Sequence, residues 1–266
     1  MILRRNAFKT DDPSCHLLPF SASRFLKCMS HRKITFIGDS LARNQYDSLL
    51  CLLSSHDHAD RPDTLTATIS HFKRYNFTVE AQFSYWRDYL MPRDIQSLSK
   101  ESHDIVVVST GAHWYRAESE TCPASAPKDC WKRADLANHT DLMKRLDDEV
   151  VARLTEFDRL PSGVTVLWRT PDVSHWSVPM SENKFDRDCS EDTMESIHND
   201  ELQLSIRDAI LKNAPAGRVI PFDVLNIGQP RADAHASPPS GKHDCLHWCF
   251  PGVPDVWNTI LYNYFC

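Results

Sequence analysis

The chain alternates short, unbroken apolar runs with longer runs in which apolar residues recur at helical spacing. The short runs are rich in branched side chains, which is typical of buried strands, and they occupy residues 33–37, 104–109, 164–168 and 218–222. Two longer stretches, 132–160 and 191–212, place apolar residues three or four positions apart with charged residues between them, which predicts amphipathic helices. Strands that alternate with helices in this way predict a three-layer α/β/α domain with a mostly parallel central sheet.

Weaker patterns complete the expected framework. The run 76–86 is rich in β-forming residues and partly alternates, which predicts a further strand, and a short helix is expected at 24–29. A last helix is expected at 255–264, because Pro251 and Pro254 should prevent an earlier start. With 266 residues, 41% of them hydrophobic, the chain is expected to form one domain spanning 1–266, around which residues 1–31 would wrap.

The first strand leads directly into a candidate nucleophile. Gly38-Asp39-Ser40 lies between that strand and an apolar-periodic run of helical character. Glycine permits the sharp turn, and Ser40 would lie where the unpaired N–H groups of a helix N-terminus point toward it. Active sites of parallel sheets gather at the carboxyl ends of the strands. The other strand ends therefore matter as well, and they carry 111–114 with His113, 169–171 followed by His175, and Asp223.

A serine hydroxyl needs a base before it acts as a nucleophile. Asp244 and His247 lie three residues apart in what is expected to be a compact turn. The carboxylate could accept a hydrogen bond from one imidazole nitrogen while the other nitrogen faces Ser40. The acyl oxyanion would lie near the main-chain N–H of Ser40, with Gly111 and His113 as candidates for further donors. Together these residues predict a serine acyl-transfer site.

Each of these signals also has an ordinary explanation that the residues alone leave open. A Gly-Asp-Ser triplet is expected in about one chain of this length in fifteen, and Asp244 could simply cap a turn. The histidines and cysteines that alternate within 243–249 could form half of a zinc site, although the remaining cysteines offer no matching half. His113 and His175 could be structural histidines.

Charge and cysteine content restrict the compartment and the partners. A net charge of -6 gives no general attraction to nucleic acid or anionic lipid, and no apolar run approaches the roughly 20 residues of a membrane helix. The nine cysteines are not grouped as paired CxxC zinc ligands, so an oxidising compartment is expected. Sequons at Asn76 and Asn138 agree with this compartment, and Cys122 and Cys130 bracket a loop and are expected to form a local disulfide. The opening residues lack the apolar core of a secretory signal, so any signal or anchor is expected upstream.

Five blocks of sequence carry a resemblance to a known family. They are GDSLARNQ from residue 38, TGAHWY from 110, WRTPDVSH from 168, RADAHAS from 231 and, most specifically, DCLHWCFPGVPDVWN from 244. In this order they resemble the plant trichome-birefringence-like family, over residues from about 13 to 265. That family belongs with the GDSL/SGNH-like acyl esterases and contains polysaccharide O-acetyltransferases of the Golgi.

The resemblance implies a serine-dependent polysaccharide O-acetyltransferase with Ser40 as nucleophile, His247 as base and Asp244 as its orienting carboxylate. Ser40 would take an acetyl group from acetyl-CoA or another carrier and pass it to a sugar hydroxyl, with no bound cofactor and no metal. Xylan is the commonest acceptor in the family. A hydrolase that releases acetate to water and an inactive glycan-binding module are the alternatives.

The resemblance also implies roles for residues around the site. Arg43 and Asn44 would pack or hydrogen-bond beneath it, near the oxyanion and substrate. A further set would line the acceptor groove or serve only a structural role: Arg231, Asp233, His235 and Trp248. Among the cysteines, Cys189 and Cys245 are the preferred disulfide, because it would tie the 170–190 loop to the catalytic turn. Cys15, Cys51 and Cys249 have no evident partner.

Two departures from the family pattern lead to further expectations. Family members begin with a membrane anchor and a cysteine-rich segment, so residues 1–31 are expected to be the remnant of that segment. A Golgi-lumenal or secretory location is expected with it. Ala112 and the glycine-poor stretch 175–189 depart from the family pattern and leave the acceptor pocket unassigned.

Overall fold

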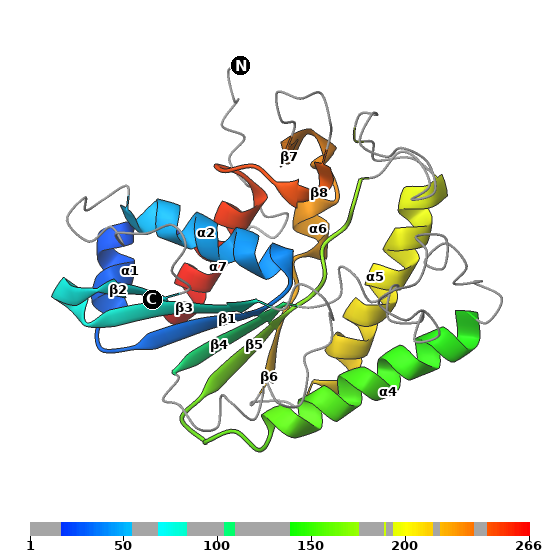
Figure 1. Ribbon diagram of the computed structural model, residues 1–266, viewed down its shortest axis with the longest axis horizontal. Helices are drawn as coiled ribbons and strands as arrows, with labels where there is room; N and C mark the ends of the chain where they lie inside the picture. The colour runs from blue at the N-terminus through cyan, green and yellow to red at the C-terminus, as the bar shows by residue number, and fades with distance from the viewer. Residues whose placement is uncertain are drawn as a thin grey trace, which may run out of the picture.

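A six-stranded sheet forms the centre of the protein (Figure 1). A computed structural model describes residues 17–54, 69–83, 104–109, 139–175, 189, 194–214, 219–236 and 244–266. The strands lie in the order β2-β3-β1-β4-β5-β6, and β2 alone in this sheet runs antiparallel to its neighbour. Their bounds are β1 (Lys33–Gly38), β2 (Ile69–Phe72), β3 (Phe77–Phe83), β4 (Ile105–Ser109), β5 (Thr165–Arg169) and β6 (Val219–Phe222).

The carboxyl ends of four neighbouring parallel strands are level with one another. Gly38 at the end of β1 pairs with Ser109 at the end of β4. Ser109 in turn pairs with Arg169, and Arg169 with Phe222. This register places the Gly38-Asp39-Ser40 turn directly beside the ends of β4 and β5, at the edge where parallel sheets bind their substrates.

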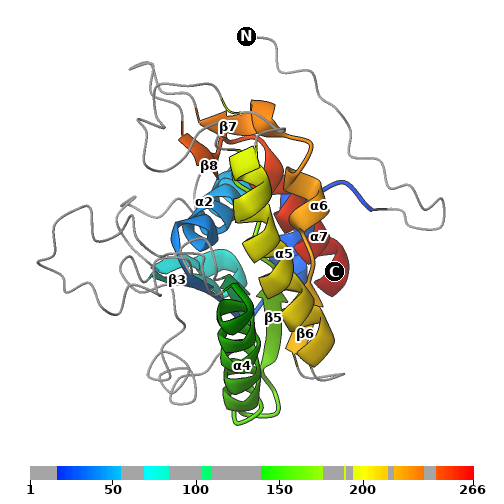
Figure 2. The ribbon, with the colours of Figure 1, turned by 90° about the vertical axis from the view of Figure 1, so that its right-hand side faces the viewer.

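Helices cover both faces of the sheet and form two separate hydrophobic cores. One face carries α1 (Ala22–Cys28), α2 (Ser40–Ser54) and α7 (Val253–Phe265), and the other carries α4 (His139–Phe157) and α5 (Met194–Asn213) (Figures 1 and 2). Phe36 and Trp257 belong to the first core, while Val108 and Ile206 belong to the second. A short helix, α6 (Leu225–Gly228), follows β6. The predicted three-layer α/β/α class with a mostly parallel sheet is confirmed, while the predicted single domain over 1–266 stays a prediction.

Three local expectations differ from the structure. Strand β2 was not expected, and it joins β3 through a short turn in which Asn76 adopts a left-handed conformation with φ of 49°. Helix α7 begins at Val253, so Pro254 lies inside its first turn. The expectation that Pro254 precedes the helix is wrong, because a first-turn residue needs no N–H donor and proline fits there. The expected compact turn at 244–247 is part of strand β8 (Asp244–Trp248), which pairs antiparallel with β7 (His235–Ala236).

Two disulfides link distant parts of the described chain. Cys189 and Cys245 form the disulfide that the family resemblance implied, and Cys28 pairs with Cys266. The second bond was not expected, and it fixes the end of α1 to the end of α7. Cys249 carries an exposed thiol. Cys15 and the expected pair of Cys122 and Cys130 lie outside the described residues.

In the described ranges, the composition of the helices and the grouping of the side chains bear on a membrane span and on a metal site. No helix there combines the length and the apolar composition that a membrane span requires. The same residues contain no group of three side chains suited to hold a metal ion.

Candidate active site

The turn that presents Ser40 requires glycine at its first position. Gly38 has a φ of +149°, and a Cβ added there would lie 1.7 Å from the main-chain oxygen of Ser109. Only glycine tolerates both the backbone conformation and this close approach. Directly after it, the Asp39 N–H donates to the Ser109 oxygen at 3.3 Å. Asp39 Oδ1 accepts from the Leu41 N–H at 2.9 Å. These bonds fix the turn to β4 and to the start of α2.

Ser40, His247 and Asp244 form a continuous series of hydrogen bonds. Ser40 Oγ lies 2.6 Å from His247 Nε2. His247 Nδ1 lies 2.6 Å from Asp244 Oδ2. In the arrangement suited to catalysis, Ser40 donates to Nε2 and Nδ1–H donates to the carboxylate. The structure therefore brings together the three residues predicted as nucleophile, base and orienting carboxylate.

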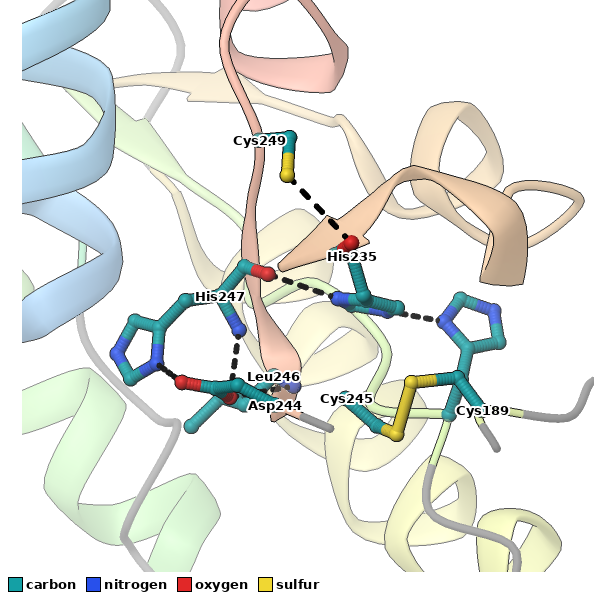
Figure 3. Close-up of a disulfide and its surroundings, with 8 residues drawn as sticks. Cys189, His235, Asp244, Cys245, Leu246, His247 and Cys249 are labelled. Atoms are coloured by element: carbon teal, nitrogen blue, oxygen red, sulfur yellow. Dashed lines mark hydrogen bonds and ion pairs between the residues drawn. A yellow bond between two sulfur atoms is a disulfide. The ribbon is translucent and has the colours of Figure 1, made fainter. Parts of the chain in front are cut away.

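An irregularity in strand β8 places Asp244 and His247 on the same side. His235 pairs with Trp248 and Ala236 pairs with Asp244, so β7 advances by one residue while β8 advances by four. Figure 3 shows the consequence, with the Asp244 carboxylate directed toward the His247 ring. Asp244 Oδ1 also accepts from the main-chain N–H groups of Leu246 at 3.1 Å and His247 at 3.2 Å. In a regular strand, residues three apart face opposite sides of the sheet.

The electrostatics favour an ionised carboxylate in this series. Burial by itself raises the pKa of Asp244, but the hydrogen bond and charge of His247 outweigh burial, with help from the main-chain N–H groups of Leu246 and His247. The net result lowers the pKa of Asp244 to about 2. The carboxylate is therefore available to hold the imidazole with Nδ1 protonated and Nε2 facing Ser40.

Asn44 connects the helix that carries Ser40 to the strand that carries His247. It lies one turn beyond Ser40 on α2, and its Oδ1 accepts from the Trp248 N–H at 3.1 Å. This agrees with the expected hydrogen bonding of Asn44 beneath the site. Its neighbour Arg43 lies at the surface and forms an exposed ion pair, in which Arg43 Nε lies 3.5 Å from Asp47 Oδ2. Its expected part near the substrate stays a prediction.

A second connection between α2 and the C-terminal segment was not evident from the sequence. Asn258 Nδ2 donates to the Gln45 main-chain oxygen at 3.0 Å and to Ser48 Oγ at 2.9 Å. Ser48 Oγ donates to Asp255 Oδ1 at 2.5 Å. Asp255 Oδ2 also accepts from the Gly252 N–H at 2.7 Å, at the start of α7. These bonds secure α7 against α2 and thereby position the segment that follows β8.

A buried arginine lies beneath the serine turn. Arg169 is fully buried at the end of β5, donates from Nη2 to Ser109 Oγ, and has Cζ 3.9 Å from the centre of the Trp257 ring. Burial lowers the pKa of Arg169 to about 10, although the charges of Asp39 and Asp172 oppose this shift. The guanidinium remains a cation at neutral pH and offsets the charge of the buried Asp39 carboxylate. The sequence identified this position only as a strand end.

The other predicted site residues lie around β8 or outside the described residues. Arg231 Nε lies 2.8 Å from Asp233 Oδ1 in an ion pair at the surface. Trp248 is 3% exposed and His235 is 5% exposed, and their rings stack with centroids 4.0 Å apart. The expected contact of all four with an acceptor stays a prediction. Gly111 and His113 lie outside the described residues.

A serine, a histidine and an aspartate lie in series at the carboxyl edge of a parallel sheet, an arrangement that is typical of serine acyl-transfer enzymes of the α/β class. The chain belongs to the PC-esterase family, the GDSL/SGNH-like acyl-esterase family found in Pmr5 and Cas1p, whose family model matches residues 17–264. This match confirms the resemblance found in the sequence.

Curated relatives that share about a quarter of their residues with this chain carry names that agree with this family. Xylan O-acetyltransferase 3 of Oryza sativa subsp. japonica is 26% identical over 94% of this chain and 64% of its own length. Protein trichome birefringence-like 13 of Arabidopsis thaliana is 26% identical over 93% of this chain and 70% of its own length. Xyloglucan O-acetyltransferase 2 of Arabidopsis thaliana is 26% identical over 93% of this chain and 69% of its own length. The chain thus spans less than two thirds of the length of the rice xylan O-acetyltransferases 3 and 4.

Proposed function

We propose that this protein transfers acetyl groups to hydroxyls of a cell-wall polysaccharide such as xylan, through an acetyl-Ser40 intermediate. The observation that carries the proposal is the 2.6 Å contact between Ser40 Oγ and His247 Nε2, with Asp244 on the other imidazole nitrogen. Membership of the PC-esterase family supports acyl chemistry. Relatives named xylan and xyloglucan O-acetyltransferases support a polysaccharide acceptor.

The first half of the reaction moves the acetyl group onto the enzyme. His247 Nε2 takes the Ser40 hydroxyl proton as Oγ attacks the acetyl carbonyl carbon of the donor. Asp244 accepts from Nδ1–H and stabilises the imidazolium that forms. The Ser40 N–H, at the start of α2, donates to the oxyanion. The bond between carbonyl carbon and donor then breaks, and the departing group takes the proton from His247. Base catalysis of this kind contributes about 10²–10⁴-fold.

The second half returns the enzyme to its starting state. A sugar hydroxyl gives its proton to His247 and attacks the acetyl carbonyl carbon. The bond to Ser40 Oγ breaks, and Ser40 recovers a proton from His247. The sum is an acetyl donor and a sugar hydroxyl converted into deacetylated donor and sugar acetate. Acetyl-CoA or another activated acetyl carrier is the proposed donor.

Water is the competing acceptor, so the test compares acceptors directly. The protein is incubated with 4-nitrophenyl acetate, with and without xylan oligosaccharides, and intact mass is recorded together with free acetate and acetylated oligosaccharide. A transferase gains one acetyl group on Ser40 and passes it to the oligosaccharide. Acetate release that the oligosaccharide does not change, without acetylated product, would show a hydrolase. Ser40→Ala is the control that should neither gain the acetyl group nor release acetate.

The proposed location is the Golgi lumen or another secretory compartment. The disulfides Cys28–Cys266 and Cys189–Cys245 support it, because such bonds persist in oxidising compartments. Protease protection of the protein in sealed microsomes tests the location, and digestion without detergent would contradict it.

A further inference from the structure

Two buried histidines lie behind the strand that carries the proposed base. His235 Nδ1 lies 3.0 Å from the main-chain oxygen of His247, and its Nε2 lies 2.6 Å from His175 Nδ1. His175 Nε2 lies 2.9 Å from the main-chain oxygen of Gln229. His175 is 2% exposed and His235 is 5% exposed. Figure 3 shows His235 on the side of β8 away from the His247 ring.

The pair also holds β8 at other points. The His175 main-chain N–H donates to the Cys245 oxygen at 2.9 Å, and the His235 ring stacks on Trp248. Cys245 and Trp248 flank His247 on either side along the strand. The two histidines therefore contact three of the five residues of β8.

The number of ring protons limits which contacts can form. Main-chain oxygens only accept, so the bond to His247 requires a proton on His235 Nδ1. A neutral His235 then has a lone pair on Nε2, and the 2.6 Å contact requires His175 to donate from Nδ1. Two neutral imidazoles hold two ring protons in total. The third contact, with Gln229, forms only when the pair binds an additional proton.

The surroundings of His235 favour its neutral form. Burial lowers the pKa of His235 to about 4, aided by the charges of His175 and His247. The main-chain oxygen of His247 and the charge of Asp244 oppose this shift. The charge of Asp233 also interacts with this ring. If both imidazoles are neutral and His235 donates to the His247 main-chain oxygen, the two ring protons must lie on the two Nδ1 atoms.

We propose that His175 and His235 are positioning residues for the proposed acetyl transfer, with His235 in its Nδ1–H tautomer and held there by a proton on His175 Nδ1. His235 restrains the His247 main chain so that the His247 imidazole reaches both Ser40 and Asp244. This inference rests on the proposed function for its effect on rate. The tautomer is a property of the folded protein that does not depend on any activity.

A matched pair of variants separates positioning from packing. His235→Asn places an amide N–H near the Nδ1 position, while His235→Gln places its amide near Nε2, and both lose the stack on Trp248. His235→Asn is expected to keep kcat for Ser40 acetylation by 4-nitrophenyl acetate within about fivefold of wild type, and His235→Gln to lower it about 10- to 100-fold. The KM is expected to change less than about threefold in both. Equal kcat values, or a faster His235→Gln, would overturn the proposal.

A second variant and a spectroscopic measurement remain informative if the His235 variants do not fold. His175→Asn can donate from its amide to His235 Nε2, so it is expected to keep kcat within about fivefold of wild type, whereas His175→Leu is expected to lose at least about tenfold. In the wild type, ¹⁵N-histidine NMR at neutral pH is expected to show His235 protonated on Nδ1, with the signal assigned by NOEs between the His235 ring and the Trp248 indole that stacks on it. A proton on Nε2 alone would overturn the proposal. A wild type that shows this tautomer but no acetyl-Ser40 would contradict the proposed function and leave the hydrogen-bond assignment intact.

Discussion

Asp244→Asn removes one charge and almost no volume from the proposed site. The carboxylate accepts from His247 Nδ1–H at 2.6 Å and from the main-chain N–H groups of Leu246 and His247 at 3.1 and 3.2 Å. An amide has one acceptor oxygen and one donor nitrogen, so it cannot serve both sets. If its oxygen keeps the main-chain bonds, its NH₂ faces Nδ1 and the imidazole proton moves to Nε2. Ser40 then faces a proton where it needs a lone pair.

The substitution is expected to lower both the acetylation rate and the stability of the protein. The wrong tautomer is expected to slow Ser40 acetylation on the order of 10³–10⁴-fold. The pKa of Asp244 falls from 3.8 to about 2 in the fold, so the carboxylate stabilises the protein above about pH 4 and loses this effect toward pH 2. Because the side chain is 33% exposed, solvent screening reduces the contribution to about 1 kcal/mol.

The assay combines rate and stability. Acetylation by 4-nitrophenyl acetate is followed by intact mass, and the free energy of unfolding is measured with urea at about pH 7 and about pH 2.5. Asp208→Asn, whose side chain is 69% exposed on α5, is the matched control and should behave as wild type. The stability difference between Asp244→Asn and wild type should shrink at the lower pH. An Asp244→Asn rate within about tenfold of wild type would refute the assigned role of Asp244.

The remaining predictions concern the serine turn, the Asn44 hydrogen bond and the sequon at Asn76. Gly38→Ala is expected to lower the free energy of unfolding by more than about 3 kcal/mol in urea titrations, whereas Gly163→Ala, whose added methyl meets nothing within 4 Å, should change it by less than about 1 kcal/mol. Equal effects would contradict the close approach at Gly38. Asn44→Ala leaves the Trp248 N–H unpaired and should cost about 1–3 kcal/mol while slowing Ser40 acetylation; Asn44→Asp keeps an acceptor oxygen and should recover most of the rate, and failure to do so would count against this hydrogen bond. Asn76 is exposed in its turn, so after expression in a secretory pathway the wild type should lose more mass on glycosidase treatment than Asn76→Gln; equal losses would mean that Asn76 is unmodified.

The sequence predicted those elements whose stability depends on local, repetitive patterns. The unbroken valines of 104–109 predicted β4 to within one residue, because a strand in the middle of a parallel sheet is apolar on both faces. Strand β2 was missed because it is a four-residue edge strand with alternate residues exposed, which gives almost no hydrophobic signal. The first turn of α7 was misjudged because a proline near a helix start has two opposite meanings, and neighbouring sequence does not decide between them.

In the candidate site, too, local sequence patterns identified some residues and missed others. Ser40 could be identified because a glycine-bearing turn between a strand and a helix is a local feature, and Asp244 and His247 because they lie three residues apart. The bonds from Asn258 to Gln45 and Ser48 join residues more than 200 positions apart, and polar contacts between helices leave no periodic trace in a sequence. The buried Arg169 was equally hidden, since a single arginine at a strand end resembles any exposed one.

Ser40 and the histidine proposed to activate it are separated by 207 positions in the chain. During synthesis the serine therefore emerges first, and it has no base until β8 has also been made and has docked on α2. A translation product that stopped before residue 244 would carry the nucleophile without the groups proposed to activate it. If the proposed function is correct, the onset of acyl-transfer activity consequently reports that β8 has been synthesised and has docked on α2.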